Sequence, residues 1–218
     1  MNDSEQKSGN AFVLETVLEA PPSQQEMVGA PGMLFNEEAM AVVLSKHAIT
    51  ERLLILCTKD VKFSEFMREI LLCSLAVVKS EAGSILELNP KSNCLFFRSV
   101  VGSSSDQVVN YEIPMGQGVV GHVAESKQPL VVVRGEENDI TLQSIQKAVG
   151  FEPRNLIALP ILIRGRVFGV LELLNRIGQE QYSSSDIEIL NYFTEMAARA
   201  IEVRLMLAWS KRSHQEAA

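Results

Sequence analysis

The stretch NRIGQEQYSSSDIEIL (175–190) contains residue types that can form an ion pair beside a helix start. Arg176 and Asp186 carry opposite charges, and Tyr182 and three serines lie between them. A guanidinium group can donate two parallel hydrogen bonds to one carboxylate. Arg176 and Asp186 can therefore tie the exit of a strand to the start of a helix.

The serines of this stretch can also cap a helix without any ligand. Ser183 and Asp186 have the spacing of a capping pair, and Ser185 with Glu188 is an alternative register. An acid in the first turn is further stabilised by the helix dipole. We interpret the group as a structural support, with direct ligand contact as the alternative. Its members are Asn175, Arg176, Tyr182 and Asp186.

A second candidate is the glycine loop GQGVVG (116–121), which leads into a short predicted helix. The N–H groups of a helix start attract phosphate or carboxylate oxygens. Gly118 and Gly121 allow a close backbone approach. The loop is therefore a candidate binding position for an anionic group.

Composition excludes several classes of protein. The chain has 218 residues, of which 46% are hydrophobic, so it can build one domain with a core. Its net charge is -7 without a dense basic cluster, which argues against a nucleic-acid partner. Cys57, Cys73 and Cys94 form no Cys-x-x-Cys pair, so neither a disulfide framework nor a zinc site is expected.

The location and chemistry of the protein follow from what the sequence lacks. The polar first ten residues have no signal-peptide pattern, and the longest apolar run, 70–78, is too short for a bilayer. We expect a cytoplasmic protein without membrane contact. No Ser-His-Asp order, phosphate-binding Walker loop or paired catalytic acids stand out, so we expect no enzyme activity.

The chain divides by composition into a tail, a helix and a domain. Residues 1–35 are polar and interrupted by APPSQQ and GAPG, which predicts a flexible tail. Within it, AFVLETVLEA (11–20) is either unstructured or a short helix that docks to a partner or to the domain. A helix is expected over 36–58, the domain over 59–211 and a short tail over 212–218.

The predicted fold is α+β, with an antiparallel sheet of about six strands. Terminal helices cover one face, and short helices and loops cover a pocket on the other. The expected elements are a helix at 62–80, strands at 82–90, 94–102 and 108–114, a helix at 119–127, a strand at 129–133, a helix at 139–150, strands at 155–163 and 167–175, and a helix at 183–211.

The last predicted helix carries two apolar stripes. One repeats at spacings of four and three through Ile189, Phe193, Met196, Ala200, Val203 and Leu207, and the other holds Leu190, Ala197, Ile201 and Ala208. One stripe suits the sheet, and the other suits a helix of the same chain or of a second subunit. We favour a parallel or antiparallel homodimer through the terminal helices.

Two segments, IPMGQGVVGHVAESKQPLVVV and VGFEPRNLIALPILIRGRVFGVLELLNR, resemble signatures of GAF domains. The similarity covers roughly residues 60–205 and is greatest to the GAF modules of cyclic-nucleotide phosphodiesterases and adenylyl cyclases. Modules that bind cyclic nucleotides carry Asn-Lys, a gap, Phe, three residues and Asp-Glu. Here Asn175, Arg176, Tyr182 and Asp186 follow that motif, and Ile187 replaces its last acid. The resemblance implies that the basic and acidic residues form a bridge that supports the pocket.

The resemblance also implies a ligand position between the sheet and segment 116–155. The backbone of Val119 and Val120, after Gly118, would lie beside a nucleotide, and Glu172 would face the purine. Asp139 and Gln143 would lie in a capping region, and Arg154 and Asn155 would lie near the pocket. A ligand-contacting position that is polar in the family corresponds to Leu86 or Ile85 here, which departs from the family pattern.

The resemblance implies a non-catalytic regulatory module that senses a small ligand. A cyclic nucleotide is the leading candidate, no other cofactor is expected, and the signal would pass through dimeric helices to a protein partner. The N-terminal tail is a candidate contact for that partner. The alternative is an adaptor with the same fold and no ligand. GAF enzymes that reduce methionine sulfoxide need clustered loop cysteines, and bilin-binding modules need an attachment cysteine; both patterns are missing.

Overall fold

The computed structural model of the chain describes residues 37–102, 111–134 and 153–216. Its elements are α1 (Glu37–Thr58), α2 (Phe63–Val77), β1 (Ser80–Asn89), β2 (Cys94–Val101), β3 (Glu112–Pro114), α3 (Gly118–Ser126), β4 (Leu130–Val133), β5 (Asn155–Ile163), β6 (Arg166–Arg176) and α5 (Ser184–Glu216). These agree with the predicted order. The tail 1–35 and the helix expected over 139–150 lie outside the described residues.

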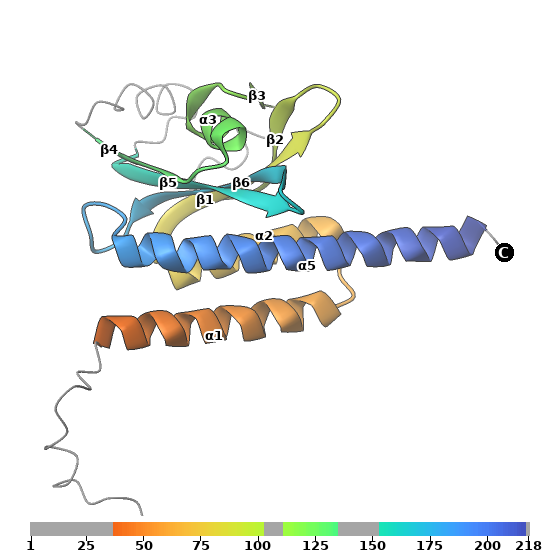
Figure 1. Ribbon diagram of the computed structural model, residues 1–218, viewed down its shortest axis with the longest axis horizontal. Helices are drawn as coiled ribbons and strands as arrows, with labels where there is room; N and C mark the ends of the chain where they lie inside the picture. The colour runs from red at the N-terminus through yellow and green to blue at the C-terminus, as the bar shows by residue number, and fades with distance from the viewer. Residues whose placement is uncertain (1–36, 103–110, 135–152, 217–218) are drawn as a thin grey trace, which may run out of the picture. The chain divides into compact units, whose positions relative to one another are not determined.

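The strands form one antiparallel sheet in the order β3-β2-β1-β6-β5-β4 (Figure 1). This confirms the predicted α+β class and the six-stranded sheet. A tight hairpin joins β5 to β6, where Arg164 and Gly165 have φ values of 50° and 74°. Glycine adopts such a left-handed conformation without strain, which explains the Arg-Gly-Arg sequence at this turn.

The helices α1, α2 and α5 lie on one side of the sheet, and α3 lies on the other (Figure 1). The helix α5 packs on β5, and α1 packs on α5 and α2. Four side chains of α5 are fully or almost fully buried at spacings of three and four, namely Leu190, Phe193, Ala197 and Ile201. The helix α5 therefore has two packed surfaces, one on β5 and one on the chain's own α1, whereas Val203 and Leu207 of the first predicted stripe are exposed.

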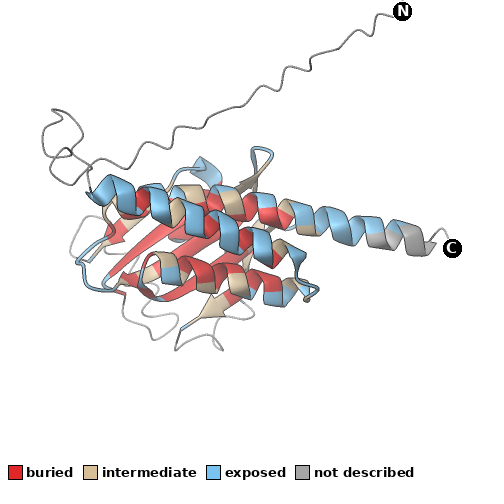
Figure 2. Cartoon of the chain, turned by 90° about the horizontal axis from the view of Figure 1, so that it is seen from below, coloured by how far each residue is buried: buried red, intermediate tan, exposed pale blue. Residues whose placement is uncertain are grey.

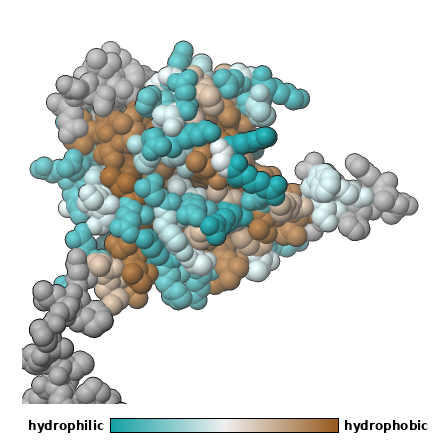
Figure 3. Space-filling view, viewed as in Figure 1, coloured by the Kyte–Doolittle hydropathy of each residue, from teal (hydrophilic) through white to brown (hydrophobic). Residues whose placement is uncertain are grey.

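The outer face of α1 remains exposed, as Figure 2 shows for the helical side of the sheet. Its exposed apolar side chains are Met40, Val43, Leu44, Leu54 and Ile55. The helix α5 extends past the end of α1 and exposes further apolar side chains there, visible as brown surface among hydrophilic residues in Figure 3. None of the helices in the described ranges combines the length and the apolar composition that crossing a membrane requires.

Candidate functional site

The exit of β6 and the start of α5 are joined by a buried ion pair. Arg176 donates from Nε to Oδ2 of Asp186 at 3.0 Å and from Nη2 to Oδ1 at 3.2 Å. The two side chains are only 14% and 8% exposed. The guanidinium group also donates to the backbone carbonyls of Lys79 and Ile177. This is the two-bond geometry that the residue types predicted.

Asp186 also caps α5 in the predicted register. Its Oδ2 accepts from the Ser183 N–H at 3.0 Å, and the Ser183 Oγ accepts from the Asp186 N–H at 3.1 Å. These reciprocal bonds form a capping box. The alternative register is absent within this described segment, because Ser185 donates to Glu38 and Glu188 accepts from Lys46, both on α1.

Two asparagines complete this junction at the ends of β5 and β6. Asn155 donates from its side chain to the Glu180 carbonyl and accepts from the Arg176 N–H. Asn175, in a left-handed conformation with φ of 58°, accepts from the Arg154 N–H at 2.7 Å and donates to Glu81 at 2.9 Å. The Asn175 side chain therefore provides hydrogen-bond partners for a backbone N–H group and a carboxylate at the ends of the strands.

Tyr182 fills the junction from the loop before α5. Its side chain is buried, and its hydroxyl group lies 3.0 Å from the Ser80 Oγ at the start of β1. Burial raises the pKa of Tyr182 above its ordinary value. The group therefore stays neutral, and a structural role explains the residue fully.

The glycine loop positions α3 over the opposite face of the sheet. Val119 and Val120 are buried and pack with Leu86, Ala158 and Val170. A Cβ at Gly121 would lie 2.6 Å from the Pro114 carbonyl oxygen, so this position needs glycine. Gly118 has φ of 61° with open space around it, and no side chain in the described residues caps this helix start through Gln117. The first N–H groups of α3 thus remain suitable for an anionic group.

Glu172 lies buried on the sheet face that α3 covers. It pairs with Ser84 on β1 and with Ala158 on β5 across the sheet. The Ser84 hydroxyl donates to its carboxylate at 3.2 Å. Removal from water raises the pKa of Glu172 to about 7, and the Ser84 hydrogen bond opposes this effect only in part. The carboxyl group can therefore carry a proton near neutral pH.

The structure brings together only part of the predicted ligand site. Val119, Val120 and Glu172 lie on the α3 side of the sheet, and Gly118 begins that helix. The Arg154 side chain instead forms a 2.6 Å ion pair with Glu81 and belongs to the junction. Asp139 and Gln143 lie outside the described residues.

The register of β1 decides between Leu86 and Ile85 for the predicted ligand-contacting position on this strand. Leu86 faces α3, whereas Ile85 packs into the helical layer and cannot contact a ligand on the α3 side. The polar residue on the α3 side is Ser84, which the sequence did not single out. Its role depends on strand pairing with Glu172, and no local motif signals that pairing.

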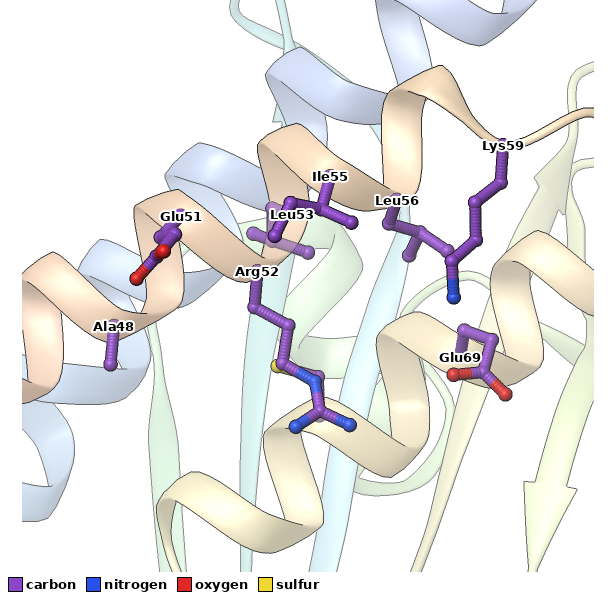
Figure 4. A pocket seen from close by; sticks show the side chains of 9 residues that line it. Ala48, Glu51, Arg52, Leu53, Ile55, Leu56, Lys59 and Glu69 are labelled. Atoms are coloured by element: carbon purple, nitrogen blue, oxygen red, sulfur yellow. The ribbon is translucent and has the colours of Figure 1, made fainter.

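A hollow of about 430 Å³ lies between α1 and α2, and no sequence pattern predicted it. In Figure 4, Arg52 extends from α1 toward α2, and Lys59 and Glu69 approach each other. Two acids and two bases balance its charge, and exposed Ile55 belongs to its rim. The hollow is lined by Ala48, Glu51, Arg52, Leu53, Ile55, Leu56, Lys59, Glu69 and Cys73.

The three cysteines lie on separate elements: Cys57 in α1, Cys73 in α2 and Cys94 at the start of β2. Burial raises the pKa of the Cys57 and Cys73 thiols, which disfavours the reactive thiolate form. Within the described ranges, no three His, Cys, Asp or Glu side chains are arranged to hold a metal ion.

Comparison with known proteins agrees with this architecture. The cone cGMP-specific 3',5'-cyclic phosphodiesterase subunit alpha' of Bos taurus is 26% identical over 163 residues, which are 72% of this chain and 17% of that subunit. This chain therefore spans less than a fifth of the length of that relative. The rod subunit alpha of Canis lupus familiaris is 30% identical over 90 residues, 41% of this chain and 10% of the subunit.

The fold also matches solved structures. The GAF domain of a phosphoenolpyruvate-protein phosphotransferase from Coxiella burnetii aligns with a TM-score of 0.63 at 15% identity, covering 78% of this chain and 98% of that one. Free methionine-R-sulfoxide reductase from Neisseria meningitidis, solved with its substrate, aligns with a TM-score of 0.60 at 16% identity, covering 76% and 93%. The family model of the GAF domain matches residues 62–201. The chain thus belongs to the GAF domain family.

Proposed function

We propose that this chain is a non-catalytic regulatory GAF module that binds a small organic ligand between α3 and the sheet. The observation that carries the proposal is the buried carboxyl group of Glu172 on that sheet face. A carboxyl group in such surroundings is costly, and acids with shifted pKa values concentrate at functional sites. With a pKa of about 7, Glu172 can donate or accept a hydrogen bond at neutral pH. The ability to donate and the ability to accept a hydrogen bond both suit the polar edge of a purine.

A cyclic nucleotide is the leading candidate for the ligand. Its phosphate suits the first N–H groups of α3, where Gly118 leaves open space. Because the whole chain carries a net charge of -7, an anion needs such locally arranged donors. The similarity to a cGMP-specific phosphodiesterase subunit, over 72% of this chain, supports the same ligand class.

The proposed module is regulatory because its three cysteines lie on separate elements, and two of them, Cys57 and Cys73, lack the features of a reactive site. A similar fold occurs in free methionine-R-sulfoxide reductase, so the fold alone does not exclude catalysis. Here Cys57 and Cys73 lie in helices, and burial raises the pKa of each. We therefore assign no catalytic residue to this chain, and we place it in the cytoplasm as part of the same proposal.

A thermal-shift panel tests the ligand. Cyclic AMP, cyclic GMP and cyclic dinucleotides are added separately to the full chain, and the unfolding midpoint is recorded. We expect one of them to raise the midpoint in a concentration-dependent way, because a ligand that binds only the folded state stabilises it. A midpoint unchanged by every nucleotide would instead favour the ligand-free adaptor.

The signal would leave the site through β6 and α5. Glu172 lies on β6, and the same strand ends at Arg176, whose partner Asp186 begins α5. A ligand that moves β6 therefore acts on α5 through the buried junction. A protein partner would receive this change, and residues 1–35 are the candidate contact from sequence.

We further propose that the chain forms a homodimer through its terminal helices. The support is the exposed apolar face of α1, where Leu54 is 66% and Leu44 61% exposed. Val203 and Leu207 add exposed apolar side chains on α5. Exposed apolar side chains that gather on one helix face mark an interaction surface.

Leu54→Glu is expected to convert the dimer into a folded monomer, because a carboxylate cannot be buried in this apolar contact without cost. Analytical ultracentrifugation of the full chain measures the mass. Ser126→Glu adds the same charge at an exposed position of α3 and is expected to leave the dimer intact. A wild-type chain that stays monomeric at high concentration would refute the dimer.

A further inference from the structure

A second hollow, of about 650 Å³, lies where the β5–β6 hairpin meets the extended end of α5. Four of its residues, Glu202, Leu205, Met206 and Trp209, have the spacing of one helix face. The hairpin supplies the rest, namely Ile163, Arg164 and Arg166. The hollow is distinct from the candidate ligand site, because the α3 side of the sheet contributes none of these side chains.

The floor of this hollow is apolar and open to solvent. Trp209 is the only tryptophan of the chain, and it is 74% exposed. Leu205 and Met206 beside it are 42% and 50% exposed. Tryptophan in an apolar group of this kind is typical of the residues that dominate protein–protein binding energy.

The rim of the hollow is basic. The Arg164 side chain is 69% exposed, and Arg166 is exposed as well. Lys127, at the end of α3, does not line the hollow, but it donates to the Gly165 carbonyl of the same hairpin at 3.0 Å. The one acid among the lining residues, Glu202, forms an ion pair with Arg164. A positive, apolar hollow on a chain of net charge -7 complements an acidic apolar partner.

We propose that this hollow docks an acidic amphipathic segment of a partner protein. The segment would place an apolar side chain beside Trp209 and carboxylates on Arg164 and Arg166. Arginine suits this role because it binds carboxylates through two parallel hydrogen bonds. A concave surface fits a protruding segment better than it fits a flat anionic bilayer, although the residue types alone would suit both.

The position of the hollow links it to both layers of the domain. The hairpin contacts α3 through Lys127 and contacts α5 through the Arg164–Glu202 pair. The docking face of α5 also differs from its proposed dimer face, because Val203 and Leu207 project elsewhere around the helix. A failed test here therefore leaves both the ligand and the dimer proposals standing.

The test uses the full chain and a synthetic amphipathic peptide with Leu and Phe on one face and Glu on the other. Because the peptide lacks tryptophan, the emission of Trp209 reports binding directly, and we expect a shift to shorter wavelength on burial. The double variant R164E/R166E should weaken binding at least about tenfold. A peptide with Lys in place of Glu should then bind this variant more tightly than the wild-type chain.

Two further variants control the result. R199E reverses an exposed arginine elsewhere on α5, where Arg199 pairs with Glu195, and should leave the affinity unchanged. W209A should weaken binding at least about tenfold when the anisotropy of a labelled peptide is measured. The proposal is overturned if the acidic peptide does not bind, if R199E acts as strongly as R164E/R166E, or if Trp209 responds only to vesicles of phosphatidylserine and phosphatidylcholine.

Discussion

Replacing Asp186 with alanine is expected to lower the free energy of unfolding by about 3–5 kcal/mol, because it leaves a buried guanidinium group without its carboxylate partner. Arg176 is only 14% exposed and loses both of its bonds to the carboxylate. The Ser183 N–H also loses its cap. Urea unfolding at pH 7 measures the loss, and circular dichroism should show that the fold is retained.

An exposed ion pair on the same helix provides the control. Glu195 and Arg199 are 59% and 67% exposed, so Glu195→Ala should cost less than about 0.5 kcal/mol. Arg176→Lys should fall between the two, since lysine keeps the charge but loses the two-bond geometry. If Asp186→Ala and Glu195→Ala destabilise equally, the junction does not hold β6 and α5 together as described.

Replacing Glu172 with glutamine is expected to stabilise the protein at alkaline pH by about 3 kcal/mol, as an order of magnitude. Burial raises the pKa of this carboxyl group to about 7 from an ordinary value of 4.5. The folded state therefore holds the proton more tightly than the unfolded state. Stability from this group is complete below pH 4.5 and is lost as the pH rises through about 7. Glutamine has no charge to bury, so the unfolding free energy of the variant does not fall in this way as the pH rises.

The measurement is the difference in unfolding free energy between variant and wild type at several pH values from 5 to 8. Glu81→Gln is the matched control with the opposite sign. Hydrogen bonds from Asn175 and Arg154 hold the pKa of Glu81 below its ordinary value, so glutamine there should destabilise at neutral pH. A Glu172→Gln difference that stays constant with pH would show that the carboxyl group is not held in apolar surroundings.

The junction was predictable because its chemistry is local. Arg176, Ser183 and Asp186 lie within eleven residues, and the rules for capping and for guanidinium–carboxylate pairs apply directly to such spacing. The same holds for the hairpin at Gly165 and the two buried surfaces of α5. Glu81 escaped notice, and Asn155 was predicted near the ligand and not in the junction, because both reach their partners only after three strands have aligned.

The candidate ligand site depended on register, which the sequence does not specify by itself. Glu172 meets Ser84 because β1 and β6 pair antiparallel with these two residues opposite each other. A shift of one residue would turn Ile85 to the α3 side and Ser84 to the helices. The hollow beside Trp209 was equally hidden, since it arises from the distance that α5 extends beyond its neighbours.

The most direct test of the account is a calorimetric titration of the nucleotide selected by thermal shift. It is carried out on the wild-type chain and on Val120→Trp, which places a bulky side chain between α3 and the sheet, where Val120 is 4% exposed. Circular dichroism checks that the variant is folded, and Glu172→Gln serves as a second variant. We predict binding heat for the wild type, none for Val120→Trp and a changed affinity for Glu172→Gln. Equal affinity in all three folded proteins would contradict a ligand site between α3 and the sheet.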